Sequence, residues 1–203
     1  MNYEKLPSEE TIAKTAEAIK QRGIAMIVVS NKEEALEKVK SLIPEGASVM
    51  NGSSTTLDEI GFIEYLQSGK HQWQNLHEPI LKEQDQQKRM ELMRQAILAD
   101  YFLGSINAIA ETGELVAADA SGSRIGAYPF AAGKVILVSG VNKIVPKLED
   151  AIKRVREYAY PLEDERAKKV YGMGSVVGKM LIIEKEIFPQ RTTLILVKEK
   201  LGF

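Results

Sequence analysis

Cysteine is missing from the 203-residue sequence, and histidine occurs only twice. Without cysteine this chain forms no disulfide, offers no thiol nucleophile and holds no iron–sulfur cluster through thiolates, so a redox role would depend on a partner. The two histidines, His71 and His77, lie six positions apart, which puts them on no common helical face, and no third ligand lies near them in the sequence. We therefore interpret both as surface histidines and expect neither a metal site nor a resident cofactor.

The sequence also lacks an excess of charge and a long apolar run. Its 27 basic and 28 acidic residues nearly cancel, and no basic patch stands apart from acidic neighbours, so nucleic acid and anionic membranes are poor candidates for partners. No uninterrupted apolar segment approaches the roughly 20 residues that span a bilayer, and no basic-then-apolar signal opens the sequence. We expect a cytoplasmic protein without a membrane partner.

What is present is the composition of an ordinary globular protein. Apolar residues make up 44 % of the chain and charged residues 27 %. A chain of this length can bury one substantial core. We expect a single domain over residues 1–203.

Short apolar runs alternate with segments of helical periodicity. In residues 8–22 apolar side chains recur at helical spacing, and the continuous apolar run 24–29 that follows predicts a central parallel strand covered on both faces. A second helix is expected at 32–43, and a short buried strand begins at Ser48. This alternation is typical of right-handed parallel crossovers and a doubly wound α/β sheet.

The later part of the sequence extends this pattern. Residues 78–99 have the pattern of one long helix with a solvated, charge-rich middle, and residues 134–139 that of another buried strand. The apolar runs 181–183 and 192–197 flank a turn that contains Pro189. They predict a C-terminal β-hairpin that completes the sheet.

A Gly/Ser/Thr turn follows the strand that begins at Ser48, where an open α/β fold binds its ligand. Asn and Gly adopt positive φ most easily, and the residues after them expose backbone N–H groups and hydroxyls that suit an anion. The expected ligand contacts in this turn are Asn51, Gly52, Ser53, Ser54, Thr55 and Thr56. The alternative is structural: Thr56 and Glu59 form a capping box, and acidic side chains in the first turn of a helix repel a phosphate.

Two more loops after apolar runs carry positive charge. The loop 117–126 holds Ser121 and Arg124, and a guanidinium is well suited to a carboxylate or a phosphate. A surface arginine paired with Asp119 is the alternative. After the strand 134–139, Gly140 and Lys143 are further candidate contacts for an anionic ligand.

A glutamate lies between an apolar strand and a glycine turn in the stretch 108–116. In this position the carboxylate of Glu111 is a candidate base or nucleophile. Capping of a backbone N–H is the alternative. Thr112 and Gly113 form the turn between two apolar strands and are counted with the candidate ligand contacts.

Four stretches together resemble one family, the lactate-utilisation (LUD) domain. They are 52–61 (GSSTTLDEIG), 108–116 (AIAETGELV), 138–145 (VSGVNKIV) and 194–203 (LILVKEKLGF), and their order and spacing cover nearly the whole chain. The resemblance implies a three-layer α/β sandwich around a mainly parallel sheet, the fold of ribose-5-phosphate isomerase, glucosamine-6-phosphate deaminase and the CoA transferases. In that fold the loops after the parallel strands bind phosphorylated or acyl-CoA ligands.

The resemblance also implies a part in bacterial L-lactate oxidation beside iron–sulfur partner subunits, or a protein that stands alone. Single-domain relatives often carry a cysteine cluster in the C-terminal third, whereas the glycine-rich segment 172–178 of this sequence has none. Binding of a cluster by this chain is therefore excluded, and a direct electron-transfer role is not expected.

These observations leave three functional hypotheses. The first is a protein that binds a small anionic metabolite, phosphorylated, carboxylate or CoA-type, among the turn 52–56, the loop 121–124 and Lys143. The second is an enzyme of the CoA-transferase or sugar-phosphate isomerase type, which needs Glu111 to face the same cleft as Arg124. The third is a non-catalytic subunit of a redox complex, and a homo-oligomer is compatible with each.

Overall fold

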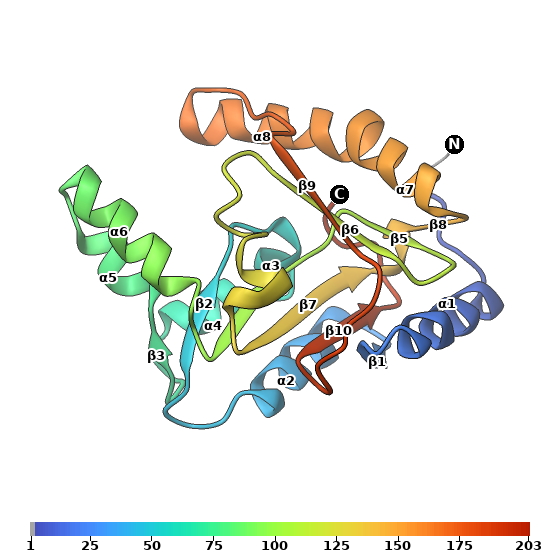
Figure 1. Ribbon diagram of the computed structural model, residues 1–203, viewed down its shortest axis with the longest axis horizontal. Helices are drawn as coiled ribbons and strands as arrows, with labels where there is room; N and C mark the ends of the chain where they lie inside the picture. Colours follow the sequence, from blue (N-terminus) through green and yellow to red (C-terminus); the bar gives the residue numbers. More distant parts are fainter. Residues whose placement is uncertain (1–2) are drawn as a thin grey trace.

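A six-stranded sheet forms the centre of the computed structural model, which describes residues 3–203. Every neighbouring pair of its strands is parallel. The spatial order is β1 (Ala25–Val29), β10 (Thr192–Val197), β7 (Lys134–Gly140), β4 (Tyr101–Gly104), β2 (Ser48–Asn51) and β3 (Gln74–Asn75) (Figure 1). The predicted α/β fold with a mainly parallel sheet is confirmed.

The central strands have apolar side chains on both faces. In β7, Val135 and Leu137 belong to one hydrophobic core, whereas Ile136 and Val138 belong to another on the opposite face. The side chains of β10 divide between the same two cores. A strand that is covered on both faces has apolar residues at successive positions, which is why these strands appear as continuous apolar runs in the sequence.

Helices cover one face of the main sheet, and a second sheet covers much of the other. The helices α2 (Lys32–Leu42), α3 (Thr55–Glu59) and α4 (Phe62–Gln67) pack on the first face. The opposite face packs against α1 (Glu9–Gln21) and a sheet with the order β8 (Ile144–Val145), β5 (Ala108–Ala110), β6 (Leu115–Asp119) and β9 (Lys179–Ile183). The second sheet is mixed, because β5 pairs parallel with β8 and antiparallel with β6.

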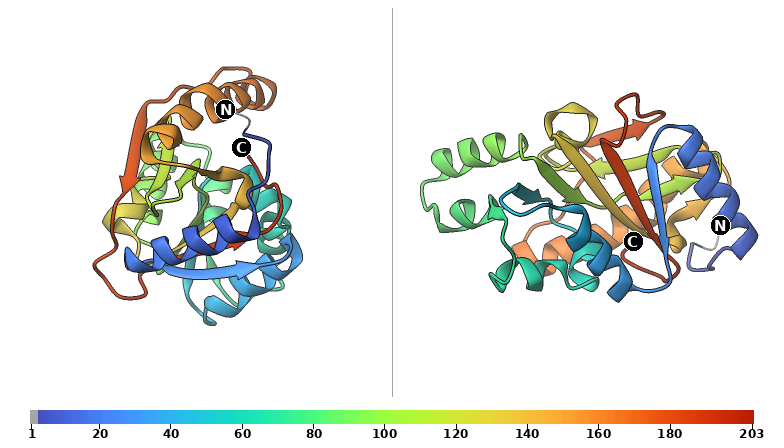
Figure 2. Two further views of the ribbon diagram at one scale, coloured as in Figure 1. Left: turned by 90° about the vertical axis from the view of Figure 1, so that its right-hand side faces the viewer. Right: turned by 90° about the horizontal axis from the view of Figure 1, so that it is seen from below.

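A helical segment lies over the outer side of the second sheet. It consists of α7 (Leu148–Arg154), the π-helical turn η3 (Val155–Ala159) and α8 (Tyr160–Tyr171), and it runs along the top of Figure 1. Side chains of α7 and η3 form a third, smaller core with β5, β6 and β8. The expected sandwich is therefore present with an additional sheet and helical layer, which the side views in Figure 2 also show.

Two predictions about strand positions were wrong. β1 is an edge strand and not a central one, and Val28 on it is 41 % exposed. The two expected C-terminal strands exist, but they do not form a hairpin: β10 lies parallel between β1 and β7, whereas β9 pairs antiparallel with β6 in the other sheet. The apolar run 194–197 of β10 gains cover on both faces inside the sheet, which a terminal hairpin would not provide.

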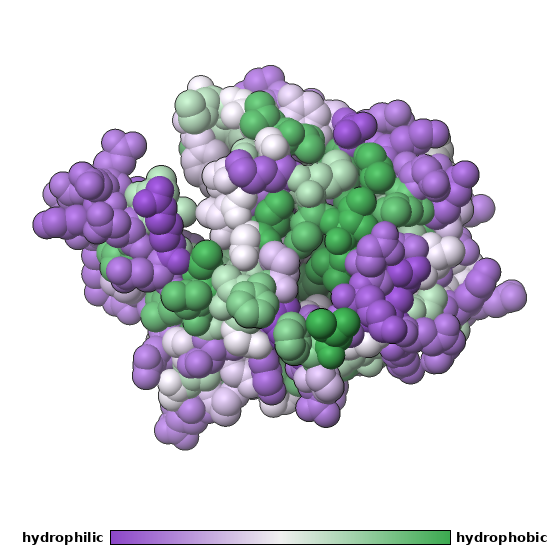
Figure 3. Space-filling model, in the orientation of Figure 1, coloured by the Kyte–Doolittle hydropathy of each residue, from purple (hydrophilic) through white to green (hydrophobic). Residues whose placement is uncertain are grey.

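The expected long helix 78–99 is two helices, α5 (His77–Lys82) and α6 (Gln86–Ala96). The chain breaks between them at Glu83, and Asp85 caps α6 by accepting from the N–H of Lys88. The pair projects from the body beside β3 and is largely hydrophilic on the side seen in Figure 3. Within residues 3–203 no helix combines the length and the apolar character needed to cross a membrane.

Candidate functional site

Three adjacent parallel strands, β7, β4 and β2, bring their carboxyl ends to one edge of the main sheet. The turn 51–56 follows β2, Ser105 follows β4, and Lys143 closes the 3-10 turn η2 (Val141–Lys143) after β7. Together with Arg124 from the loop after β6 they line a cavity of about 300 Å³. The predicted turn and both predicted cations, Arg124 and Lys143, therefore lie in one place.

Lys143 is buried in the wall of this cavity, with 2 % of its surface exposed. Its Nζ donates to Oγ1 of Thr56, to Oγ of Ser105 and to the carbonyl oxygen of Ile106, each at 3.0 Å. All three acceptors are uncharged. Burial therefore holds the pKa of Lys143 well below its ordinary value, and the charges of Arg154 and Arg124 lower this pKa further, against an opposing contribution from Glu59.

Arg154 is a second buried cation beside the cavity, with none of its surface exposed. Its guanidinium donates to the carbonyl oxygens of Asn107 and Asn142 and lies 5.0 Å from the ring centre of Tyr158. Its Nε has no hydrogen-bond partner among the residues that the structure describes. Burial lowers the pKa of Arg154 to about 10, so this group still carries its charge at neutral pH.

Arg124 reaches the cavity across Gly52. Its Nη2 donates to the carbonyl oxygen of Ala118 at 2.5 Å, and its Nη1 to that of Ser105 at 3.4 Å. A Cβ atom on residue 52 would lie 2.5 Å from Cγ and Cδ of Arg124. Glycine is therefore required here because the arginine side chain packs directly on the backbone.

The carboxylate of Asp119 is engaged by backbone and not by the guanidinium of Arg124. It accepts from the N–H groups of Arg124 at 2.9 Å and of Ile125 at 3.3 Å. The alternative of an Arg124–Asp119 side-chain ion pair is therefore wrong. Asp119 instead shapes the loop so that the arginine points across Gly52.

The capping-box alternative is also wrong. Ser54 caps α3 by accepting from the N–H of Leu57 at 3.3 Å. Glu59 accepts from the N–H of Gly202 at 2.7 Å, which ties the end of the described chain to α3. The hydroxyl of Thr56 is thus left to contact Lys143 in the cavity wall.

Two further groups line the cavity. His77 is half-buried, with Nδ1 3.2 Å from Oδ1 of Asn51, so its interpretation as a surface histidine was wrong. Burial lowers the pKa of His77, and the charge of Arg89 adds to this effect. Arg166 and Glu163 of α8 form a two-pronged ion pair with both contacts at 2.7 Å. In the described range 3–203, no three His, Cys, Asp or Glu side chains are placed to hold a metal ion.

Glu111, Thr112 and Gly113 lie in the turn between β5 and β6, outside the cavity lining. β5 leads away from the cavity at Asn107, and β6 returns to it at Asp119. The turn is consequently at the far end of this hairpin, and the condition that Glu111 share a cleft with Arg124 is not met.

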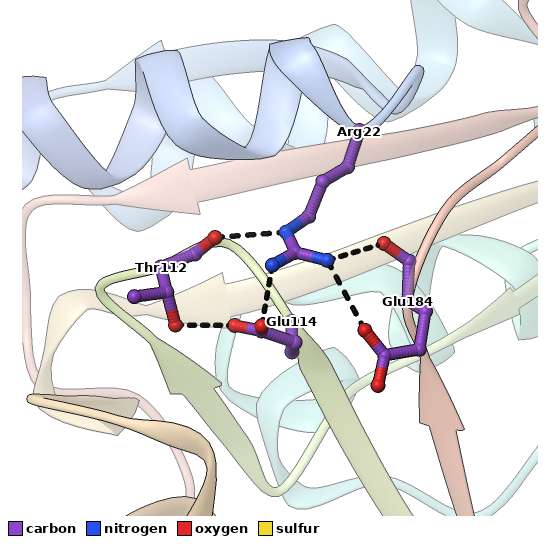
Figure 4. A network of polar contacts seen from close by, with 4 residues as sticks. All are labelled: Arg22, Thr112, Glu114 and Glu184. Atoms are coloured by element: carbon purple, nitrogen blue, oxygen red, sulfur yellow. Dashed lines mark hydrogen bonds and ion pairs between the residues drawn. The ribbon is translucent and has the colours of Figure 1, made fainter.

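This turn is tied to the end of α1 (Figure 4). Arg22 donates from Nε to the carbonyl oxygen of Thr112 at 2.8 Å and pairs with the carboxylates of Glu114 and Glu184. A Cβ atom on Gly113, where φ is 98°, would lie 2.8 Å from the backbone of Ala18. Within the turn itself, the carboxylate that contacts Arg22 is therefore that of Glu114 and not that of Glu111, and its role is structural.

Two other predicted contacts also lie outside the cavity lining. Ser121 is exposed, and its Oγ donates to Oγ of Ser123 at 2.9 Å. Gly140 is buried against the C-terminal segment, where an added Cβ would lie 2.6 Å from the nitrogen of Leu201. Gly140 thus provides space for the chain and not a ligand contact.

Ser105 and Asn107 line the cavity but were missed in the sequence. Ser105 had a usable signal, because it follows directly on the apolar strand 101–104 and carboxyl ends of parallel strands collect ligand contacts. Arg154 and Arg166 had none, since an arginine within a helical pattern is normally a solvated residue.

Comparison with known proteins agrees with this fold. The model of the LUD domain family matches residues 12–197. Among solved structures, a DUF162 family protein from Deinococcus radiodurans superposes with a TM-score of 0.56 at 15 % sequence identity. That superposition covers 95 % of this chain and 99 % of the other, and at such low identity it shows the fold alone. A search of curated proteins finds no match.

Proposed function

The chain belongs to the LUD domain family, and we therefore propose that it binds a small anionic metabolite in the cavity beside Arg124 and Lys143. In this proposal the ligand is a carboxylate or a phosphate ester from organic-acid utilisation, of which L-lactate is the simplest candidate. Arg124 holds the negative charge, and the turn 51–56 provides hydroxyl and N–H donors.

The observation that carries this proposal is the state of the Arg124 guanidinium. It donates to two carbonyl oxygens, neither of which neutralises its charge. Among residues 3–203 no carboxylate forms a salt bridge with it, and such a guanidinium in a cavity wall attracts an anion strongly, because charge-assisted hydrogen bonds are about twice as strong as neutral ones. The neighbouring carboxylates do not compete, since Asp119 binds backbone N–H groups and Glu163 binds Arg166.

The size of the cavity narrows the class of ligand. About 300 Å³ is at the lower end of the range for small-molecule sites. A hydroxy acid, an oxo acid or a small sugar phosphate fits this volume, whereas only the acyl end of a CoA ester would enter it. Small acids are therefore the first ligands to test.

Removal of the Arg124 guanidinium is expected to abolish most of the affinity. Isothermal titration of the intact protein with L-lactate and with a sugar phosphate should give measurable binding, weakened about 10- to 100-fold in Arg124→Ala, because a hydrogen bond to a charged group contributes roughly 1.5–3 kcal/mol. Arg156→Ala, an exposed arginine outside the cavity, is the matched control and should bind like the unaltered protein. Equal affinities for the two variants would contradict the proposal.

Gly52→Ala should weaken binding without removing any charge. The new Cβ would lie 2.5 Å from Cγ and Cδ and 2.9 Å from Cβ of Arg124, so the arginine must leave its position. We expect an affinity loss in the same direction as for Arg124→Ala, with a stability loss of about 1–3 kcal/mol from overpacking. Titration and thermal unfolding measure the two effects.

Gly46→Ala is the control for a loss of stability at a distance from Arg124. Gly46 has a positive φ of 77°, where alanine is strained, and an added Cβ there meets no atom within 4 Å. This variant should lose stability and keep its affinity. An affinity loss of equal size in both glycine variants would show that the loss of stability, and not the position of Arg124, controls binding.

A further inference from the structure

A serine hydroxyl and a buried amine are in direct contact in the wall of the cavity. Oγ of Ser105 lies 3.0 Å from Nζ of Lys143. Both residues are buried, with 4 % and 2 % of their surfaces exposed, and both line the cavity. A nucleophile within hydrogen-bond reach of a base, with the base held by a third group, is the arrangement that activates serine in Ser–Lys enzymes.

The three contacts of Nζ can be satisfied by a neutral amine. Such an amine has two N–H groups and one lone pair. The carbonyl oxygen of Ile106 only accepts, so it takes one N–H, whereas the hydroxyls of Ser105 and Thr56 can each donate or accept. One hydroxyl can therefore accept the second N–H while the other donates to the lone pair.

The charges around Lys143 favour this neutral form. Arg154 on α7 and Arg124 on the loop after β6 disfavour a third positive charge, as does burial, and Glu59 on α3 acts in the opposite direction. The remaining titratable or charged groups of the cavity wall are His77, Asp119, Glu163 and Arg166. None of these four hydrogen-bonds to Nζ, whose partners within residues 3–203 are three neutral oxygens.

Nζ is enclosed too closely to attack carbon itself. Three oxygens surround it, and the backbone of Gly202 covers a further side, where an added Cβ would lie 3.2 Å from Nζ. Gly202 also lies over Thr56, because a Cβ atom added to Gly202 would lie 2.4 Å from Oγ1 of Thr56. Oγ of Ser105 also lies 3.2 Å from Oγ1 of Thr56 and from the carbonyl oxygen of Ile106, but it is not among the atoms nearest to a Cβ atom on Gly202. Ser105 is consequently the better placed nucleophile of the two hydroxyls, and Lys143 can exchange protons with it.

We propose that Ser105 is the nucleophile and Lys143 its general base in an acyl-transfer reaction on an ester or thioester of a small anionic acid. The inference rests on the proposed function for one point only, that Arg124 holds the anionic end of the substrate. Because Arg124 donates to the carbonyl oxygen of Ser105, the charged end and the reacting hydroxyl belong to the same part of the cavity.

The reaction balances without any further reagent except water. Oγ of Ser105 forms a bond to the acyl carbon while its proton moves to Nζ of Lys143. The bond from the acyl carbon to the alkoxide or thiolate breaks, and Lys143 returns the proton to that leaving group. Water then attacks the acyl-serine and gives a proton to Nζ of Lys143. The bond from the acyl carbon to Oγ breaks, Lys143 returns the proton to Oγ of Ser105, and the acid is released.

Diisopropyl fluorophosphate is a suitable probe, because it phosphorylates activated serines and carries no charge that Arg124 must bind. Incubation of the intact protein between about pH 6 and 10 should add one diisopropylphosphoryl group to Ser105, located by mass spectrometry of peptides. The rate should rise with pH and level off below the ordinary pKa of lysine, since only neutral Lys143 accepts the proton. This profile requires no variant. Absence of the adduct, or an adduct on another residue, would overturn the proposal.

Variants then separate the two roles. Ser105→Ala should take up no label, and Lys143→Met should react about 10²- to 10⁴-fold more slowly, the usual contribution of a general base. Ser139→Ala is the matched control: this serine is buried near the end of β7 and bonds a carbonyl outside the cavity lining. A folded Lys143→Met protein that reacts at the original rate would contradict the role of Lys143.

Two further measurements keep this proposal distinct from the proposed function. Titration of the unaltered protein with L-lactate tests the proposed function by itself: binding without any labelling of the intact protein would overturn the reaction alone, whereas labelling of Ser105 without binding of L-lactate would overturn the proposed function alone. Borohydride treatment in the presence of 2-oxobutyrate should leave Lys143 unmodified. A reduced adduct on Lys143 would assign the lysine as nucleophile and overturn the role given to Ser105.

Discussion

Replacing Arg154 by alanine is expected to lower the free energy of unfolding by about 3–5 kcal/mol, the range for truncating a large buried side chain. Arg154 is the largest side chain that is fully buried. Its loss would leave a cavity between α7 and the second sheet and remove donors from the carbonyl oxygens of Asn107 and Asn142. Relief of the buried charge offsets part of the loss. Urea unfolding at neutral pH measures the difference.

Arg154→Met separates the volume of the side chain from its charge. Methionine fills much of the same space, and replacement of a buried charge by an apolar group is often nearly neutral, so most of the stability lost in Arg154→Ala should be recovered. Nε of Arg154, which has no hydrogen-bond partner among the described residues, adds to this expectation, because methionine places no polar N–H group in that position. Equal losses for both variants would mean that the guanidinium contacts, and not packing, stabilise this region.

The same methionine variant tests the electrostatic link between Arg154 and Lys143. Since the charge of Arg154 lowers the pKa of Lys143, its removal should raise that pKa. The midpoint of a carbon-13 NMR titration of the Lys143 side chain should therefore move to higher pH in Arg154→Met. An unchanged midpoint would show that burial alone determines the protonation of Lys143.

Gly104→Ala is expected to be the most disruptive single-methyl substitution near the site. An added Cβ would lie 1.8 Å from Oη of Tyr128, a fully buried side chain whose hydroxyl donates to the carbonyl oxygen of Ser105 at 3.1 Å. Overpacking of this kind costs about 1–3 kcal/mol, and here Tyr128 must also give up a buried hydrogen bond. We expect a loss of about 3 kcal/mol in thermal or urea unfolding, with weaker binding of L-lactate.

Tyr128→Phe provides the matched test of this mechanism. In the double variant Gly104→Ala/Tyr128→Phe, the closest clash disappears, although the ring carbons Cζ and Cε1 would still lie 2.8 and 3.1 Å from the new Cβ. The double variant should therefore recover part of the stability and not all of it. If the stability loss of the double variant equalled the sum of the losses of the two single variants, the effect of Gly104→Ala would not arise from its contact with Tyr128.

The predictions that succeeded depended on local patterns. The helices expected at 8–22 and 32–43 are present as α1 and α2, and the alternation of apolar strands with amphipathic helices indicated the parallel sheet. The same pattern placed the turn 51–56, Arg124 and Lys143 after apolar runs, and the structure brings them to one cavity. Short-range periodicity and turn chemistry are properties of neighbouring residues, so they can be inferred without knowledge of the fold.

The predictions that failed depended on direction and on partners distant in the sequence. Glu111 follows a strand as Ser105 does, but β5 leads away from the cavity and β4 leads toward it, which no local pattern reveals. The place of β10 between β1 and β7 depends on the two hydrophobic cores, because its side chains pack into one core on each face of the main sheet. Those cores form only when distant segments come together. For the same reason Asp119 and Glu59 bind backbone N–H groups of the loop and the C-terminal segment and not the expected partners.

By itself, the sequence determined that this chain uses no thiol chemistry, that it alternates strands with helices, and that donors and positive charge follow its apolar runs. Only the tertiary structure decided that Ser105, Lys143 and Arg124 meet in one cavity while Glu111 lies elsewhere, and that Lys143 and Arg154 are buried with no acidic hydrogen-bond partner among residues 3–203. The physical reason is that the protonation and reactivity of a side chain depend on its solvent exposure and on the charges around it, and both arise only when distant segments pack together.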